Sequence, residues 1–131
     1  MSKAFIPYGR QSISAADVEA VCEALTSDFL TQGPLVGQFE HAIAELSQCK
    51  YAVAANSATS ALHVACLSLG VGPGDSVWTT PNTFIASANC ALYCGASVDF
   101  VDIDPQTYNL CPESLAEKLA DAAAAGRLPK V

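Results

Sequence analysis

The segment Ser-Ala-Thr-Ser at residues 57–60 is the part of this sequence best suited to bind an anion. It follows an apolar run at residues 51–55, which we predict to be a short buried strand, and it precedes a predicted helix over residues 58–69. The first amides of a helix lack intrahelical acceptors and carry partial positive charge, so a phosphate can bind there. The hydroxyls of the segment would add donors. A simpler interpretation also stands, in which Asn56 or Ser57 is an ordinary N-cap.

A second junction between a strand and a helix carries an aromatic residue. Residues 76–80 have the pattern of a strand and residues 83–93 that of a helix, so the segment Pro-Asn-Thr-Phe at residues 81–84 falls at the carboxyl end of a strand. Ligands of open α/β sheets bind at this edge. Phe84, in the first turn of the predicted helix, is placed to stack on a planar ring, although an aromatic residue there can equally belong to the core.

Other suggestive patterns have simpler explanations. The glycines of LGVGPGD lie after a helix and before a strand, which is the reverse of the dinucleotide-binding order, so they predict a turn. Asp99, Asp102 and Asp104 are better explained by a solvated strand end and an Asp-Pro turn than by a metal site. His63 is expected to be a packing residue. We therefore predict no metal site.

The cysteines predict neither a metal site nor a disulfide framework, because the sequence has no CxxC pair and only two histidines. Free thiols pack as small apolar groups, so we expect them to be mostly buried. Cys90 and Cys94, four residues apart, should share one helix face. The six positions are Cys22, Cys49, Cys66, Cys90, Cys94 and Cys111.

The composition describes one soluble globular unit. The chain has 131 residues, of which 51% are hydrophobic and 15% charged. Its 13 acidic and 6 basic residues give a net charge of -7, which argues against nucleic-acid binding, and any anion would have to be held by backbone groups. The sequence begins without an apolar signal region and has no stretch long enough to span a membrane, so we expect a cytoplasmic protein without a membrane partner.

Helices and strands alternate along the chain. Ser14 and Asp17 predict a capping box for a first helix that ends near Ser27, and Pro34 suits the first turn of a second helix. Further along, we expect a strand over residues 97–103 and a helix over residues 112–125. Alternating strands and helices predict an α/β fold, with a parallel sheet and helices on both of its faces.

The last residues, GRLPKV, have the pattern of a helix stop followed by the start of another strand. A parallel sheet with an unpaired edge exposes backbone donors and acceptors. We therefore expect the chain to be a truncated part of a larger domain.

Several segments together resemble the DegT/DnrJ/EryC1/StrS family of sugar aminotransferases. They are FLTQGPLVGQFE, AANSATSALHVA, GPGDSVWTTPNTFIASANCALYCGA and VDFVDIDPQTYNL, in the order and spacing of the family. The resemblance implies the aspartate-aminotransferase fold (fold type I) of enzymes that depend on pyridoxal 5'-phosphate (PLP). Residues 1–34 would form an amino-terminal arm, helix and substrate-lining loop, and residues 35–131 the first, incomplete part of the PLP-binding large domain.

The resemblance also implies roles for individual residues. The family binds the cofactor phosphate at the start of the helix that follows this strand, which assigns Ser57, Ala58, Thr59 and Ser60 to the phosphate. The aromatic residue that stacks on the pyridine ring corresponds to Phe84. The segments PYGR and LTQG match parts that line the sugar-nucleotide pocket, so Tyr8, Thr31 and Gly33 are candidate substrate contacts.

The reaction implied by the resemblance is transfer of an amino group, with glutamate as the expected donor, to C4 of a UDP-linked 4-keto-6-deoxy-N-acetyl sugar. The motifs are closest to the branch of the family that serves pseudaminic acid biosynthesis. In the family the Schiff-base lysine and the carboxylate that partners the pyridinium nitrogen lie further along the chain than Val131. None of Lys3, Lys50, Lys118 and Lys130 matches the lysine, so we assign no catalytic residue and expect this chain alone to be inactive.

The resemblance leaves alternatives open. Family members are usually homodimers, so a second copy is an expected partner of the intact protein, beside the sugar nucleotide and the amino donor. Some relatives carry histidine in place of the lysine and dehydrate the sugar at C3. A noncatalytic module that binds a phosphorylated ligand, or a partner chain, is a third possibility.

Overall fold

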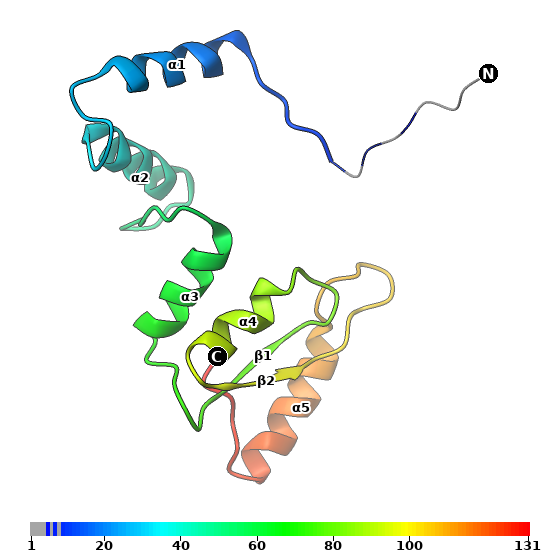
Figure 1. Ribbon diagram of the computed structural model, residues 1–131. Helices are drawn as coiled ribbons and strands as arrows, with labels where there is room; N and C mark the ends of the chain where they lie inside the picture. Colours follow the sequence, from blue (N-terminus) through cyan, green and yellow to red (C-terminus); the bar gives the residue numbers. More distant parts are fainter. Residues whose placement is uncertain (1–4, 6, 8) are drawn as a thin grey trace. The chain divides into compact units, whose positions relative to one another are not determined.

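The computed structural model describes residues 5, 7 and 9–131 and is drawn in Figure 1. The chain divides into two compact units, Met1–Ala54 and Ala55–Val131. In the part of the chain that the structure describes, no helix is both long and apolar enough to cross a membrane.

The first unit contains α1 (Ala15–Thr26) and α2 (Pro34–Leu46). The start of α1 confirms the predicted capping box. The Ser14 hydroxyl accepts a hydrogen bond from the Asp17 amide at 3.2 Å, and the Ser14 amide donates to the Asp17 carboxylate at 2.7 Å. The bond from the Ser14 amide, followed by the hydrogen bond that the Ser14 hydroxyl donates to the same carboxylate at 2.8 Å, lowers the pKa of Asp17. Pro34 begins α2 as expected.

The end of α2 is set by a residue in the left-handed region. Gln48 has a φ of 54°, and the Cys49 amide donates to the Ala44 carbonyl at 3.0 Å, which closes the last turn. The large apolar residues of α2 are mostly exposed, with Phe39 at 57% and Leu46 at 81%. Of the described residues in this unit, Ala44 alone is buried.

Residues 51–55 do not form the buried strand that the apolar pattern predicts. The side chains of Tyr51 and Val53 are 75% and 81% exposed, and no ladder includes this segment. A strand needs a hydrogen-bonded neighbour. Here the Ala54 amide instead donates to the Glu40 carboxylate at 2.8 Å.

The second unit holds α3 (Ala58–Ser68), β1 (Ser76–Thr79), α4 (Ala86–Tyr93), β2 (Ser97–Phe100) and α5 (Pro112–Ala124). The two strands are parallel, and their register pairs Val77 with Val98 and Trp78 with Asp99. This confirms the predicted α/β alternation, although β2 ends at Phe100 rather than at residue 103.

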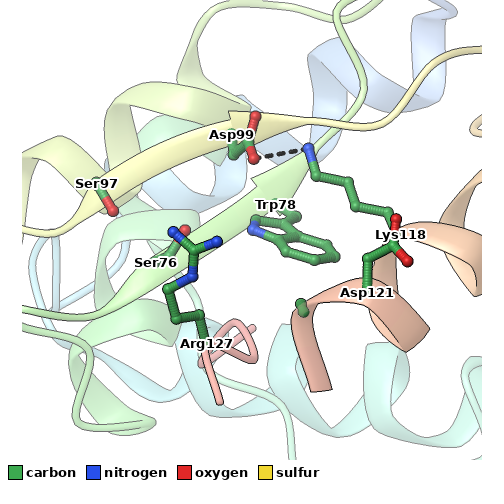
Figure 2. A pocket seen from close by; sticks show the side chains of 8 residues that line it. Ser76, Trp78, Ser97, Asp99, Lys118, Asp121 and Arg127 are labelled. Atoms are coloured by element: carbon green, nitrogen blue, oxygen red, sulfur yellow. Dashed lines mark ion pairs between the residues drawn. The ribbon is translucent and has the colours of Figure 1, made fainter. Parts of the chain in front are cut away.

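Helices lie on both faces of the sheet, as predicted. Successive strand residues point to opposite faces. Val77 and Val98 face a core with α3 and α4, to which Cys66, Cys90 and Ala91 contribute. Their neighbours Trp78 and Asp99 lie on the other face, where α5 packs through Lys118 (Figure 2).

The turn between α3 and β1 confirms the interpretation of its glycines. Gly70 and Gly74 have φ values of 69° and 93°, and the Asp75 carboxylate accepts a hydrogen bond from the Gly72 amide at 2.9 Å. At the other end of the unit, the Lys130 amide donates to the Ser76 carbonyl at 2.8 Å and the Trp78 amide to the Val131 carbonyl at 2.9 Å. The last residues therefore pair with the backbone of β1, as expected for the start of a strand.

Candidate functional site

The start of α3 has the geometry of a capped helix with free amides. Ser57 is extended, its hydroxyl accepts a hydrogen bond from the Ser60 amide at 3.2 Å, and its carbonyl accepts one from the Ala61 amide at 3.0 Å. The interpretation of Ser57 as an N-cap is confirmed. The cap satisfies one amide, and the amides of Ala58 and Thr59 precede the first intrahelical bond and stay available.

This helix start fits a phosphate. The Ser57 hydroxyl donates a hydrogen bond to the Ser60 hydroxyl at 3.1 Å, which leaves the Ser60 O–H as a donor next to the free amides. Ser57 and Ala58 are exposed, whereas Thr59 and Ser60 are half-buried. Because all four side chains are small, an anion can approach the backbone closely, where the helix dipole favours negative charge.

Phe84 lies in the loop between β1 and α4. Sequence spacing predicted a helix from residue 83, but α4 begins at Ala86 after the cap Ile85, so Phe84 precedes the helix. Its carbonyl accepts a hydrogen bond from the Ser87 amide at 3.0 Å. Phe84 is 74% exposed, so it is not part of the core of this unit.

Both junctions belong to the unit Ala55–Val131, in which α3 and α4 pack against each other. The His63 ring on α3 lies 5.4 Å from the Tyr93 ring on α4, with an angle of 61° between their planes. His63 is therefore a packing residue, as predicted. The packing fixes, relative to each other, the two helices that start at or after residues 57–60 and 81–84.

The predicted substrate contacts lie elsewhere in the chain. Tyr8 is outside the described residues. Thr31 is exposed in the loop between α1 and α2, and Gly33 is the cap of α2. A Cβ at Gly33 would lie 2.6 Å from the Phe29 Cβ, so a larger residue would displace this loop.

The loop between β2 and α5 is ordered by a carboxylate. The Asp104 side chain accepts hydrogen bonds from the Gln106 amide at 2.7 Å and the Thr107 amide at 2.9 Å, which confirms the predicted turn. These two bonds lower the pKa of Asp104, and the bond from the Thr107 amide has the larger effect. Tyr108 follows with a φ of 60° and a side chain that is 64% exposed.

Lys118 forms a cluster that sequence reasoning missed. Its Nζ lies 2.7 Å from an Asp99 carboxylate oxygen, 2.6 Å from the Phe100 carbonyl oxygen and 4.8 Å from the centre of the Trp78 ring. The hydrogen bond from Lys118, followed by that from the Phe100 amide, lowers the pKa of Asp99. The spacing from Leu115 to Lys118 could have placed the lysine on the inward side.

Figure 2 shows the pocket beside this cluster, on the face of the sheet that α5 covers. Its volume is about 430 Å³. Its lining contains carboxylates, cations and hydroxyls in similar number, so it favours no single class of ligand. The lining residues are Ser76, Trp78, Ser97, Asp99, Lys118, Asp121, Ala122 and Arg127.

The thiols are only partly as predicted. Cys66 and Cys90 are buried. Cys22 and Cys49 are exposed, because α1 and the end of α2 bury few side chains in the unit Met1–Ala54. Burial, followed by the hydrogen bond with Cys90, raises the pKa of the Cys66 thiol to about 11. Residues 5, 7 and 9–131 contain no group of three or more histidine, cysteine or acidic side chains placed to hold a metal ion.

Comparison with known proteins identifies a family. The sequence model of the DegT/DnrJ/EryC1/StrS aminotransferase family matches residues 11–125. The spore coat polysaccharide biosynthesis protein SpsC of Bacillus subtilis is 43% identical over 111 residues, which are 85% of this chain and 28% of that protein. The UDP-4-amino-4,6-dideoxy-N-acetyl-beta-L-altrosamine transaminase of Campylobacter jejuni is 47% identical over 98 residues, which are 75% of this chain and 26% of the transaminase.

A solved structure has the same fold. The PLP form of Spr1654 from Streptococcus pneumoniae superimposes with a TM-score of 0.79 at 32% identity, over 86% of this chain and 29% of that protein. The same protein is also known in a PMP form, which contains pyridoxamine 5'-phosphate. The chain thus spans less than a third of the length of these relatives, with 28%, 26% and 29% coverage.

Proposed function

The chain belongs to the DegT/DnrJ/EryC1/StrS aminotransferase family, and on this premise we propose that it supplies the phosphate-binding and ring-stacking part of a PLP-dependent sugar aminotransferase. The observation that carries the proposal is the start of α3, where a capped helix presents free amides and hydroxyls within the segment matched to the family. When bound, PLP supplies an electron sink that lets an amino group pass between an amino acid and a keto sugar.

Each residue of the site has a defined task in this proposal. The amides of Ala58 and Thr59 and the hydroxyls of Ser57 and Ser60 bind the phosphate dianion. Phe84 covers one face of the ring and excludes water from it. The arm and loop at residues 1–34, with Tyr8, Thr31 and Gly33, contact the sugar nucleotide, and residues 35–131 begin the PLP-binding domain.

The substrate proposal follows the name of a relative. Because the Campylobacter jejuni protein is named as an altrosamine transaminase, we propose that the intact protein transfers an amino group from glutamate to C4 of a UDP-linked 4-keto-6-deoxy-N-acetyl sugar, in pseudaminic acid biosynthesis. We place it in the cytoplasm, where nucleotide sugars and glutamate are available, and as a homodimer.

A second candidate function is binding without turnover by this chain alone. Lys118 is held by Asp99 and Phe100 on the face of the sheet that α5 covers, and Lys50 lies over the Tyr51 ring at 5.1 Å from its centre. Transamination needs a lysine that binds the cofactor covalently and moves the proton. We therefore propose that this chain binds the cofactor without transferring an amino group.

The experiment is a titration of the chain with PLP, followed by borohydride reduction and measurement of the intact mass. We expect saturable binding and no reduced adduct at a single lysine. A stoichiometric adduct on one lysine would contradict the proposed lack of turnover, and absence of saturable binding would contradict the proposed cofactor site.

A charge variant tests whether the phosphate binds at α3. Thr59→Asp places a carboxylate at the second position of the helix, where it favours the helix but repels a phosphate. We expect PLP affinity to fall about tenfold or more, as for loss of a charge-assisted hydrogen bond. The control is Ala16→Asp, which also introduces an aspartate at the second position of a helix, α1, and should leave affinity unchanged. Equal affinity of both variants would place the phosphate elsewhere.

A further inference from the structure

The loops that follow β1 and β2 leave the sheet from neighbouring positions. Thr79 pairs with Phe100 at the carboxyl ends of the strands, and the Val101 amide donates to the Thr79 carbonyl at 2.8 Å. The loop of Phe84 and the loop of Tyr108 therefore start side by side, although they are far apart in the sequence.

The loop of Phe84 needs support, because Phe84 lies before the helix and its side chain lies outside the core. Phe84 precedes α4, and its side chain is 74% exposed. On the helix side, the Thr83 hydroxyl lies 3.1 Å from the Ser87 hydroxyl, and the Ser87 amide donates to the Phe84 carbonyl at 3.0 Å. These contacts tie the second half of the loop to α4 but leave its first half to other partners.

Asn82 supplies such a partner. Its side-chain amide donates a long hydrogen bond, 3.4 Å, to the Tyr108 carbonyl in the neighbouring loop. Asn82 stands two residues before Phe84, so a contact that fixes Asn82 also limits the orientation of the aromatic ring.

The acceptor itself is held rigidly. The Tyr108 amide donates to the Asp104 carbonyl at 2.8 Å, and the Asp104 amide donates to the Asn109 carbonyl at 2.8 Å. Tyr108 has a φ of 60°, a left-handed conformation that residues with a Cβ rarely adopt. Strained residues of this kind persist where the surroundings over-determine them, and they cluster at functional sites.

We propose that Asn82 is a positioning residue, which fixes the ring-stacking Phe84 through its hydrogen bond to the Tyr108 carbonyl. The inference rests on the proposed function, because it assigns Phe84 to the cofactor ring. The strained loop of Tyr108 then serves as the rigid support for one wall of the cofactor site, and the phosphate end at α3 is independent of it.

The test compares two probes on the purified chain. Pyridoxamine 5'-phosphate carries an amine in place of the aldehyde, so it binds without reacting with lysines, and inorganic phosphate reports on the α3 end alone. We expect Asn82→Ala to weaken pyridoxamine 5'-phosphate binding about threefold, the value of one net hydrogen bond, and to change the circular dichroism of the bound ring. Phosphate affinity should not change, and Asn82→Gln, which keeps the amide, should recover most of the affinity.

The matched control is Asn89→Ala on α4, which should behave as the original chain with both probes. If Asn82→Ala does not fold, Asn82→Asp removes the donor at the same size and gives the same comparison. Unchanged ring binding and unchanged dichroism in the Asn82 variants, with the original chain binding normally, would overturn the positioning role alone. Failure of the original chain to bind either probe would overturn the proposed function together with this inference.

Discussion

Replacing Lys118 by methionine should destabilise the chain and alter its response to acid. Methionine keeps the apolar stem of the side chain but removes the charge. The Nζ of Lys118 is 2.7 Å from Asp99, whose side chain is 56% exposed, so the ion pair is worth about 0.2–1 kcal/mol. The contact with the Trp78 ring at 4.8 Å adds about 0.5–1 kcal/mol. We therefore expect a loss of about 1–2 kcal/mol in the free energy of unfolding.

The pH dependence of that loss separates its two parts. The pKa of Asp99 is lowered in the folded state, so the ion pair contributes fully above the ordinary aspartate pKa of about 3.9 and is lost as the pH falls through the lower folded value. The difference between the original chain and Lys118→Met should therefore shrink on acidification. The part of the free-energy difference that remains in acid comes from the contact with Trp78 and the bond to the Phe100 carbonyl, because neither needs the carboxylate.

The assay is urea unfolding followed by Trp fluorescence and circular dichroism, from about pH 7 to about pH 3. Lys50→Met is the control, since Lys50 contacts only the exposed Tyr51 ring among the described interactions, and it should stay within about 0.5 kcal/mol at every pH. A loss below about 0.3 kcal/mol for Lys118→Met, or a loss that does not shrink in acid, would refute the assignment of Lys118 as the link between α5 and the sheet.

Two further predictions concern other parts of the chain. Gln48→Gly should raise the free energy of unfolding by up to about 1 kcal/mol. Gln48 has a φ of 54° at the end of α2, and glycine adopts this conformation without strain. A lower urea midpoint than that of the original chain would contradict this prediction. Iodoacetamide at about pH 8 should modify the exposed Cys22 and Cys49 first and spare Cys66, whose pKa is raised to about 11. Peptide mass spectrometry measures the order of modification. Early modification of Cys66 would contradict the prediction and show that the core opens.

The features predicted correctly from sequence are those whose partners lie within one helical turn. Ser14 and Asp17 are three residues apart, as are Ser57 and Ser60, and Pro34 acts through its own backbone. In these cases residue type and spacing determine the interaction almost completely. The start of α3 could therefore be located as a capped helix start before any coordinates were known.

The predictions that were wrong depend on distant partners. The apolar pattern of residues 51–55 describes a strand only where a neighbouring strand accepts its hydrogen bonds, and the Ala54 amide finds the Glu40 carboxylate instead. The amphipathic pattern around Lys118 does not show that Asp99 stands opposite, since the two residues meet only after β2 and α5 have packed. Helix α4 starts later than its pattern suggests, which moves Phe84 into the loop.

The same distinction divides the proposed cofactor site into two parts. Its phosphate end is a helix start, which local sequence determines and which should withstand changes elsewhere in the unit. Its ring end depends on Asn82 and Tyr108, which are 26 residues apart and meet because β1 and β2 are parallel and in register. Variants in the loop of Tyr108 should therefore weaken ring binding while sparing phosphate binding, so that affinity for the ring reports on the packing of the sheet and affinity for phosphate reports on α3.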